Sequence, residues 1–366
     1  MSTTHAEVPQ AQAPVNPLRL TSTQQRLALR VAVIILGALI VLGGMAYNLT
    51  HGNTDDPLED VITILRGEED SEIGLARYII VNNQRYPRVL LAGLVGVNLA
   101  VAGVMLQGVV RSPMGDPYIL GVSAGAGLTS SYILTKYVYA SPHTVSAAAF
   151  GGALAGTLLV YLIAWDGSGT TTTRLVLTGV ALTTMLGIMT TSIIVMNVQG
   201  GGQIYFQRLV GGLYGKNIDD YYQLAPWTIG GLVAALVLAR QANILALGDD
   251  VARGLGLHVE RTRFLMAVAA AILAGSAVAV VGMIAFVGLI VPVFVRLVFG
   301  SDYRIMIPAN TIFGAALVIW ADALARLHVP GWLGEAGNEF ISVGIVTGVI
   351  GGPLFLWMVR ARRMQW

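Results

Sequence analysis

Side chains able to carry out catalysis or bind a metal are few in this chain and are not clustered. The chain has no cysteine, which excludes disulfides, thiolate metal sites and a cysteine nucleophile. Its histidines are scattered and make no ligand cluster: His5, His51, His143, His258 and His328. No paired carboxylates and no Ser/His/Asp set indicate an enzyme. We therefore predict no catalytic residue, no metal site and no cofactor bound by the chain itself.

A nucleotide-hydrolysing site is also absent from the sequence. A P-loop needs a glycine-rich turn that ends in Lys followed by Ser or Thr. The only lysines are Lys136 and Lys216, and neither lies in such a turn. This chain does not carry that ATPase site.

The chain is too apolar for a soluble protein. Its 366 residues are 55% hydrophobic and only 11% charged, whereas soluble chains carry roughly 25% charged residues. Its 44 glycines suit membrane helices that approach one another closely. The composition predicts an all-α membrane protein.

Ten apolar runs are near the length that crosses a bilayer, about 20 residues. They lie at 26–48, 88–110, 118–138, 143–165, 174–198, 222–245, 263–282, 284–299, 305–327 and 340–360. We predict about ten transmembrane helices, with a tight turn at Gly282. The polar start, 1–23, lacks the features of a signal peptide and predicts a disordered cytoplasmic tail before a transmembrane domain at 24–366.

The distribution of charge predicts the orientation. Ten spans place both ends on one side of the membrane. With both ends in the cytoplasm, most of the Lys and Arg residues are cytoplasmic and the 49–87 loop, rich in Asp and Glu, is outside. We therefore predict an N-in, C-in arrangement.

The predicted span centres are nearly free of charge. Their polar residues are neutral (Asn98, Gln107, Asn197 and Asn310), and Asp322 lies nearer an outer end. Proton-driven carriers place ionisable groups at mid-membrane. The pattern argues against such a carrier, while sodium coupling through backbone carbonyls stays open.

Two polar segments interrupt the apolar pattern on the predicted cytoplasmic side. The 248–263 segment begins with Asp249 and Asp250, which suit a helix N-terminus, and glycines then break that helix. A second helix can begin near Val259. The other segment contains two prolines four residues apart, which exclude an uninterrupted helix and predict a rigid turn: Arg111, Pro113, Asp116 and Pro117.

Three motifs in order resemble the FecCD family of permease subunits. The first joins RYPR (85–88), VGVNLAVAGVMLQG (95–108), RSPMGDP (111–117) and ILGVSAGA (119–126). The second is GDDVARGLGLHVERTR (248–263), and the third joins AFVGLIVP (285–292) to VGIVTGVIGGP (343–353). The resemblance covers about 85–360. The chain departs from the family pattern at Val293, where the family has His, and at Glu339 to Ser342, where it has Glu-Leu-Pro.

The family resemblance implies the partners. FecCD proteins are channel subunits of ABC importers for iron–siderophores, haem and cobalamin. It implies a second permease subunit, the same or similar, two cytoplasmic ATPase subunits that use ATP and Mg²⁺, and an extracytoplasmic substrate-binding protein. The expected location is a bacterial or archaeal cytoplasmic (inner) membrane, and no nucleic acid takes part.

The resemblance also assigns roles to residues. ATPase coupling falls to Asp249, Asp250, Val251, Ala252, Arg253, Gly254, Leu255, Gly256 and Leu257, and we expect Ala252 and Leu255 to face the ATPase. Arg111, Pro113, Asp116 and Pro117 form a turn near the ATPase. Binding-protein docking falls to Arg85, Arg88 and Arg326. Pathway lining falls to Thr178, Thr183, Thr184, Thr190, Thr191 and Asn197.

Plainer interpretations stay open for several of these residues. The 248–263 segment can be an ordinary polar loop, and the 111–117 turn can be only a turn. Arg85 and Arg88 can extend to the lipid headgroups, and Arg326 can pair with Asp322 on one helix face. The hydroxyls of 174–198 can bond to neighbouring helices.

The predicted function is the channel subunit of a binding-protein-dependent ABC importer for a metal chelate, driven by ATP through alternating access. An iron–siderophore is the leading substrate, with haem or cobalamin as alternatives. An ion-coupled secondary transporter is the rival class, and it would not need the 248–263 segment.

Overall fold

The computed structural model describes residues 23–52, 56–66, 74–137, 139–167, 169–197, 211–326 and 341–360. Apart from one isolated β-bridge between Asp166 and Gly169, the regular structure of these ranges is helical. The tail expected at 1–23 lies outside them except for Thr23, which begins the first helix. The loop at 327–339 also lies outside the described residues.

The helices follow one another with short connections. They are α1 (Thr23–Thr50), α2 (Leu58–Arg66), α3 (Leu75–Ile79), the π-helical turn η2 (Ile80–Arg85), α4 (Tyr86–Val110), the 3-10 turn η3 (Pro117–Leu120), α5 (Val122–Lys136), α6 (Pro142–Ala164), α7 (Thr172–Met196), α9 (Ile218–Leu245), α10 (Asp249–Gly254), α11 (Val259–Val281), α12 (Val287–Phe299), α13 (Tyr303–Ala325) and α14 (Val343–Arg360).

Seven helical segments in the described ranges are long and apolar enough to cross a membrane. They are Leu29–Thr50, Leu75–Val110, Pro142–Ala164, Thr172–Met196, Ile218–Leu245, Val259–Val281 and Tyr303–Ala325. The other three expected spans correspond to the shorter helices α5, α12 and α14. With 15 residues, α5 is about 22 Å long, less than the roughly 30 Å of a bilayer core. The count of ten spans and the orientation therefore stay predictions.

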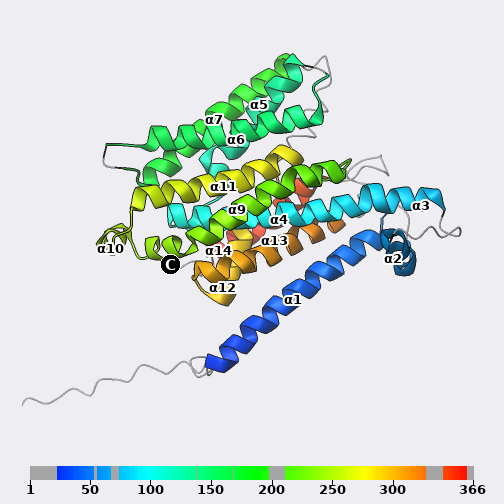
Figure 1. Ribbon diagram of the computed structural model, residues 1–366. Helices are drawn as coiled ribbons and strands as arrows, with labels where there is room; N and C mark the ends of the chain where they lie inside the picture. The colour runs from blue at the N-terminus through cyan, green and yellow to red at the C-terminus, as the bar shows by residue number, and fades with distance from the viewer. Residues whose placement is uncertain are drawn as a thin grey trace, which may run out of the picture.

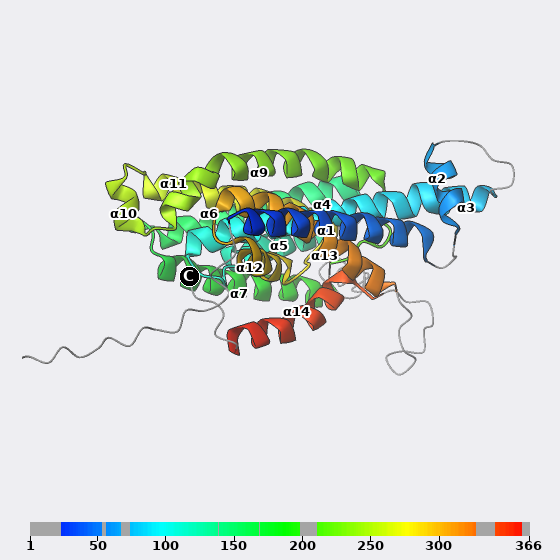
Figure 2. The same cartoon turned by 90° about the horizontal axis from the view of Figure 1, so that it is seen from below.

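Helix α4 forms the centre of the bundle. It packs against α9, α11, α12 and α13, while α5, α6 and α7 form a layer on one side and α1 packs against α13 at the edge (Figures 1 and 2). Nearly all of its side chains are buried. Glycines allow the closest approach: a Cβ added to Gly96 would lie 2.1 Å from the carbonyl oxygen of Gly314. A methyl group there would force α4 and α13 apart.

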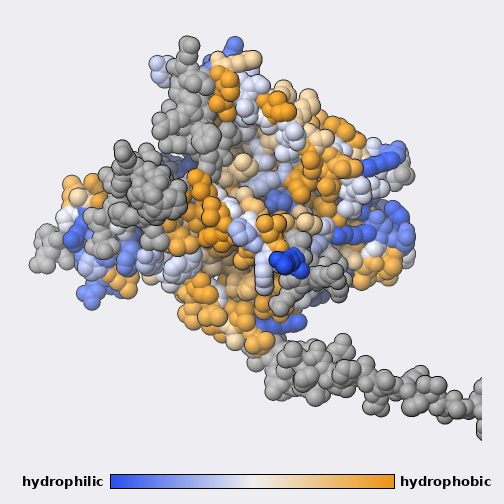
Figure 3. All heavy atoms as spheres, turned by 180° about the vertical axis from the view of Figure 1, so that it is seen from behind, coloured by the Kyte–Doolittle hydropathy of each residue, from blue (hydrophilic) through white to orange (hydrophobic). Residues whose placement is uncertain are grey.

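The two ends of the bundle are polar and its middle is apolar. Helix α10 lies at one end and α2 and α3 at the other (Figure 1). The surface seen in Figure 3 is hydrophobic across the middle and hydrophilic at both ends. Exposed apolar side chains on α1 (Leu29, Leu39) and α7 (Leu177, Ile188) contribute to this band. Lipid suits such a surface, because water would make its exposure costly.

Candidate functional site

Helix α10 projects from one end of the bundle on two flexible joints. Gly248 and Gly256 flank it with φ angles of 108° and 80°, a region that favours glycine. Asp249 and Asp250 occupy its first turn, where a helix dipole favours negative charge. The next helix begins at Val259, as the sequence predicts. The 248–263 segment is thus a helical hairpin, not an irregular loop.

The side chains of α10 divide into an outer and an inner face. Val251 and Leu255, four residues apart, are exposed (Leu255 by 61%), and Asp250 is fully exposed. Ala252 is 0% exposed and belongs to the chain's own core. The expectation that Ala252 faces an ATPase is therefore wrong, because its methyl group packs inward.

Asp249 binds two arginines from different parts of the chain. Its carboxylate accepts two hydrogen bonds from Arg263 Nη2, at 3.0 and 3.1 Å, and forms an ion pair with Arg111. Partial burial tends to raise the pKa of Asp249, but the pairs with Arg263 and Arg111 outweigh it, so the pKa is lowered. The carboxylate is held in its charged form at neutral pH.

Arg263 connects α10 to the loop before α7. Its guanidinium is 1% exposed, and it donates to the carbonyl oxygen of Thr170 at 2.6 Å and to Glu260 Oε1 at 3.0 Å. Glu260 Oε2 in turn accepts from the Thr170 backbone N at 3.0 Å and hydroxyl at 2.8 Å. A buried charge is tolerated when it is paired and fully hydrogen-bonded. This network fixes the start of α11 against the α6–α7 loop.

The segment after α4 folds back along that helix. Arg111 reverses the chain with φ 49°. A Cβ added to Gly288 would lie 2.9 Å from the Leu99 carbonyl oxygen and 3.0 Å from Pro117, so Pro117 lies at the level of Leu99. Leu99 is 11 residues before the end of α4, about 16 Å deeper in the bundle. The turn expected near an ATPase is thus divided: Arg111 lies beside α10, whereas Pro117 lies half-way along α4.

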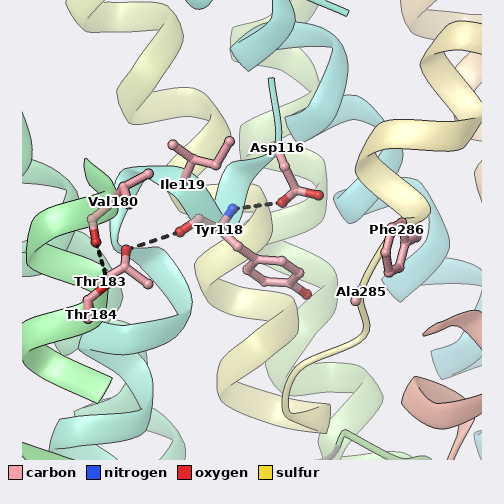
Figure 4. A pocket seen from close by; sticks show the side chains of 8 residues that line it. All are labelled: Asp116, Tyr118, Ile119, Val180, Thr183, Thr184, Ala285 and Phe286. Atoms are coloured by element: carbon pink, nitrogen blue, oxygen red, sulfur yellow. Dashed lines mark hydrogen bonds between the residues drawn. The ribbon is translucent and has the colours of Figure 1, made fainter. Parts of the chain in front are cut away.

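A surface hollow of about 310 Å³ opens beside this re-entrant segment (Figure 4). Its walls come from η3 and its cap, from α7, and from the break between α11 and α12; they are Asp116, Tyr118, Ile119, Val180, Thr183, Thr184, Ala285 and Phe286. Asp116 Oδ1 accepts from the Tyr118 backbone N at 2.8 Å, and Tyr118 Oη donates to the Ile284 carbonyl oxygen at 2.8 Å. The hollow is lined by apolar and hydroxyl groups and by one carboxylate.

Asp116 is partly exposed because the hollow opens beside it, but it lies deep within the protein. This burial raises its pKa to about 6, and the hydrogen bond from Tyr118 offsets part of the effect. The sequence did not predict a carboxylate at this depth, because the residue seemed to belong to a turn at the end of α4.

Phe286 holds a strained backbone at the edge of the hollow. Its φ is 68°, which a bulky residue adopts at a cost of roughly 1–3 kcal/mol. A Cβ added to Gly351 on α14 would lie 2.5 Å from the Phe286 Cβ, so α14 packs directly on this residue. No sequence pattern indicated this strain. The break at Gly282, φ 80°, agrees with the turn expected there.

The expected pathway residues of α7 have different environments. Thr183 and Thr184 line the hollow. Thr190, Thr191 and Asn197 donate to carbonyl oxygens four residues earlier on their own helix, at 2.8, 3.0 and 2.8 Å. Thr178 is half-buried. Pathway lining by residues other than Thr183 and Thr184 stays a prediction.

The three arginines expected to dock a binding protein lie at the end opposite α10 and have partners within the chain. Arg85 is 5% exposed, pairs with Asp56 at 3.0 Å and donates to the Leu49 carbonyl oxygen at 2.8 Å. Arg88 and Arg326 both pair with Asp322 at 2.7 Å. The predicted Asp322–Arg326 pair is confirmed, and the docking role stays a prediction.

The apolar band and the two charged ends define a multi-pass helical membrane protein. The FecCD transport family matches residues 30–361. The chain is 37% identical over 344 residues to the Fe(3+)-citrate import system permease protein YfmD of Bacillus subtilis, covering 93% of this chain and 98% of that one. It is 38% identical over 291 residues to the cobalamin import system permease protein BtuC of Halobacterium salinarum, covering 78% and 75%.

A solved structure has the same fold. An inward-facing conformation of a metal-chelate type ABC transporter superposes with a TM-score of 0.77 at 22% identity, covering 90% of this chain and 99% of that one. The chain belongs to the FecCD transport family, and the predicted resemblance is confirmed.

Proposed function

We propose that this chain forms one half of the channel of an ATP-driven importer for a metal chelate. An external binding protein delivers the chelate, two copies of the chain or two similar subunits enclose the passage, and two cytoplasmic ATPase subunits use ATP and Mg²⁺ to drive it. The curated relatives support this proposal, since their names describe import of ferric citrate and cobalamin.

The observation that carries the proposal is the division of α10 into two faces. Its outer face offers two exposed apolar side chains, Val251 and Leu255, beside the exposed carboxylate of Asp250. Its inner face is tied by Asp249 to Arg111 and Arg263. A short helix with an apolar contact outside and ion pairs inside suits a subunit that is pushed by a partner. A carrier without an ATPase has no use for this arrangement.

The lining of the hollow suits a cargo whose metal is already enclosed. Among the described residues no group of His, Asp and Glu could hold a metal ion. Apolar and hydroxyl groups, such as Ile119, Val180 and Thr184, instead match the organic surface of a chelate. An iron–siderophore is the leading cargo, with haem and cobalamin as alternatives.

A second subunit would cover the open side of the hollow. Helix α14 exposes Ile345, Val349, Leu356 and Trp357, and it lies next to the hollow through Gly351 and Phe286. Two such faces related by a two-fold axis would enclose one passage. We place the complex in a bacterial or archaeal cytoplasmic membrane, with both termini and α10 in the cytoplasm.

The test is uptake by the reconstituted complex. The permease is purified with its ATPase subunits, placed in liposomes with ATP inside, and offered a ferric siderophore on its binding protein outside. We expect accumulation that requires hydrolysable ATP. Asp116 lies where an ion-coupled carrier would place a carboxylate, so the rival makes a distinct prediction. Uptake that follows a proton gradient without ATP, and that is lost in Asp116→Asn, would overturn the proposal.

A further inference from the structure

One carboxylate at the inner face of α10 is connected to two walls of the hollow. Asp249 is the first residue of α10 and pairs with Arg111 and Arg263. These arginines come from the end of α4 and from α11, so Asp249 is a point where two separate paths begin.

The first path runs through Arg111 into the re-entrant segment. Arg111 ends α4, and five residues later Asp116 caps η3. Asp116, Tyr118 and Ile119 then form one wall of the hollow. Gly115 packs so tightly on α4 that a Cβ there would lie 3.0 Å from the Gln107 Cα. The connection is therefore short and closely packed.

The second path runs through Arg263 to α7. Arg263 donates to the carbonyl oxygen of Thr170 at 2.6 Å, two residues before α7 begins at Thr172. The residues Val180, Thr183 and Thr184 of α7 form the facing wall of the hollow. They lie 8 to 12 residues along the helix, about 12–18 Å from its start. A rigid helix carries a displacement over that distance.

We propose that Asp249 is a positioning residue that passes the displacement of α10 to both walls of the hollow at once, so that they move apart or together as a pair. The inference rests on the proposed function, since it takes the ATPase as the source of the displacement. Asp250, which points outward, contacts the ATPase, whereas Asp249 acts inside the permease. Because charge-assisted hydrogen bonds are directional and strong, neutralising Asp249 loosens both paths without removing the outer contact face.

The test compares Asp249→Asn with Asp166→Asn in the complete reconstituted complex. Asp166 also pairs with an arginine, Arg174, but both side chains are exposed. For Asp249→Asn we expect normal ATPase binding, ATP hydrolysis close to wild type, and chelate uptake per ATP lowered about tenfold, as for the loss of a typical coupling between sites. Asp166→Asn should couple as the wild type does. A purely structural role would lower hydrolysis and uptake together and leave their ratio unchanged.

Two further measurements separate the paths. Arg111→Gln should lower the ratio less than Asp249→Asn does, and the double variant should fall no further than Asp249→Asn alone, because linked residues are not additive. A cysteine at Val180, in a chain that has none, should change its rate of thiol labelling on ATP binding in the wild type but not in Asp249→Asn.

The outcomes also separate this inference from the proposed function. If the wild-type complex shows no ATP-driven uptake, the proposed function fails. If the wild type transports and Asp249→Asn keeps a wild-type ratio of uptake to hydrolysis, only the role of Asp249 is overturned.

Discussion

Arg88 on α4 holds the carboxylate of Asp322 on α13 through hydrogen bonds from Nε at 3.0 and 3.1 Å and from Nη2 at 2.7 Å. Asp322 is fully buried, and Arg326 also donates to it, at 2.7 Å. One carboxylate therefore joins two central helices at the end opposite α10. Such geometry matches the bidentate fork of arginine.

Breaking this pair should destabilise the helix bundle. Arg88→Gln leaves the buried carboxylate with one arginine, and the loss of a buried partner costs about 3 kcal/mol or more. We expect a lower thermal midpoint in detergent. Arg66→Gln, a change of the same kind at an exposed site on α2, serves as the control. Equal midpoints for the two variants would show that the Arg88–Asp322 pair adds little.

The docking role predicted for Arg85 needs a design that separates charge from structure. Arg85→Glu should weaken binding of the extracytoplasmic binding protein, more strongly at low salt, and should also destabilise the permease, because Asp56 would face a second carboxylate. Asp56→Asn removes the partner but keeps the Arg85 charge. If Arg85 docks the binding protein, only Arg85→Glu loses affinity. Equal losses in both variants would assign the effect to structure.

The pKa of Asp116 predicts a pH dependence of stability with a defined sign. Burial raises this pKa from 3.8 to about 6, so the folded protein holds the proton more tightly than the unfolded chain does. The resulting stability is fully present below pH 3.8 and is lost as the pH rises through about 6. Asp116→Asn can still accept from the Tyr118 backbone N but cannot ionise. We expect it to be more stable than the wild type at pH 7.5, with the difference vanishing toward pH 4.

Asp302 provides a control of opposite sign. Hydrogen bonds from Asn243 and the Arg304 backbone lower its pKa. Its contribution is therefore present above pH 3.8 and is lost as the pH falls through the lowered pKa. Thermal midpoints measured across pH 4–8 for the wild type, Asp116→Asn and Asp302→Asn check both signs. A constant difference between the wild type and Asp116→Asn would mean that Asp116 does not titrate in this range.

The sequence predicted the helices whose apolar runs are long and the hairpin whose glycines and acids stand at its ends. It did not predict the path of residues 111–121. An apolar run shows that a segment is buried, but not at which depth it begins, so Asp116 was assigned to an end of the bundle. The depth follows from contacts between distant residues, such as Pro117 with Gly288.

Close packing by glycine was predicted for two pairs and holds for one. Gly125 packs on Gly152 of α6, where an added Cβ would lie 2.1 Å from its carbonyl oxygen. Within the described chain, an added Cβ at Gly348 or Gly352 meets no atom within 4 Å, and it is Gly351 that packs on Phe286. Spacing alone gives the face of a helix only if its neighbours are known. The same limit applies to Ala252, whose inward side depends on where α9 and α11 lie.

The orientation can be tested with single cysteines, since the native chain has none. Glu59 on α2 and Asp250 on α10 are both exposed and lie at opposite ends of the bundle (Figure 1). An impermeant thiol reagent added to intact cells should label a cysteine at position 59 and spare one at position 250. Permeabilised cells should label both, which controls for reactivity. Labelling of position 250 alone in intact cells would reverse the assigned orientation.

The outer face of α10 supports the prediction on which the proposed function depends most. Leu255 is 61% exposed and shares this face with Val251. If the ATPase covers it, Leu255→Glu buries an unpaired charge at that contact, which costs several kcal/mol. The variant should fold and should bind the external binding protein, because the change lies at the end of the bundle away from Arg85. It should lose the ATPase on purification, or keep it with uptake uncoupled from hydrolysis.

Leu75→Glu is the matched control for Leu255→Glu. Leu75 begins α3 at the opposite end and is exposed to a similar degree, 74%, so the same new charge stays in solvent there or meets the binding protein. We expect Leu75→Glu to keep its ATPase subunits in full. ATPase retention is measured by quantifying the subunits that co-purify with each variant, and coupling by ATP-driven uptake in liposomes. Full retention and normal uptake in Leu255→Glu would remove α10 as the coupling element and favour an ion-coupled carrier instead.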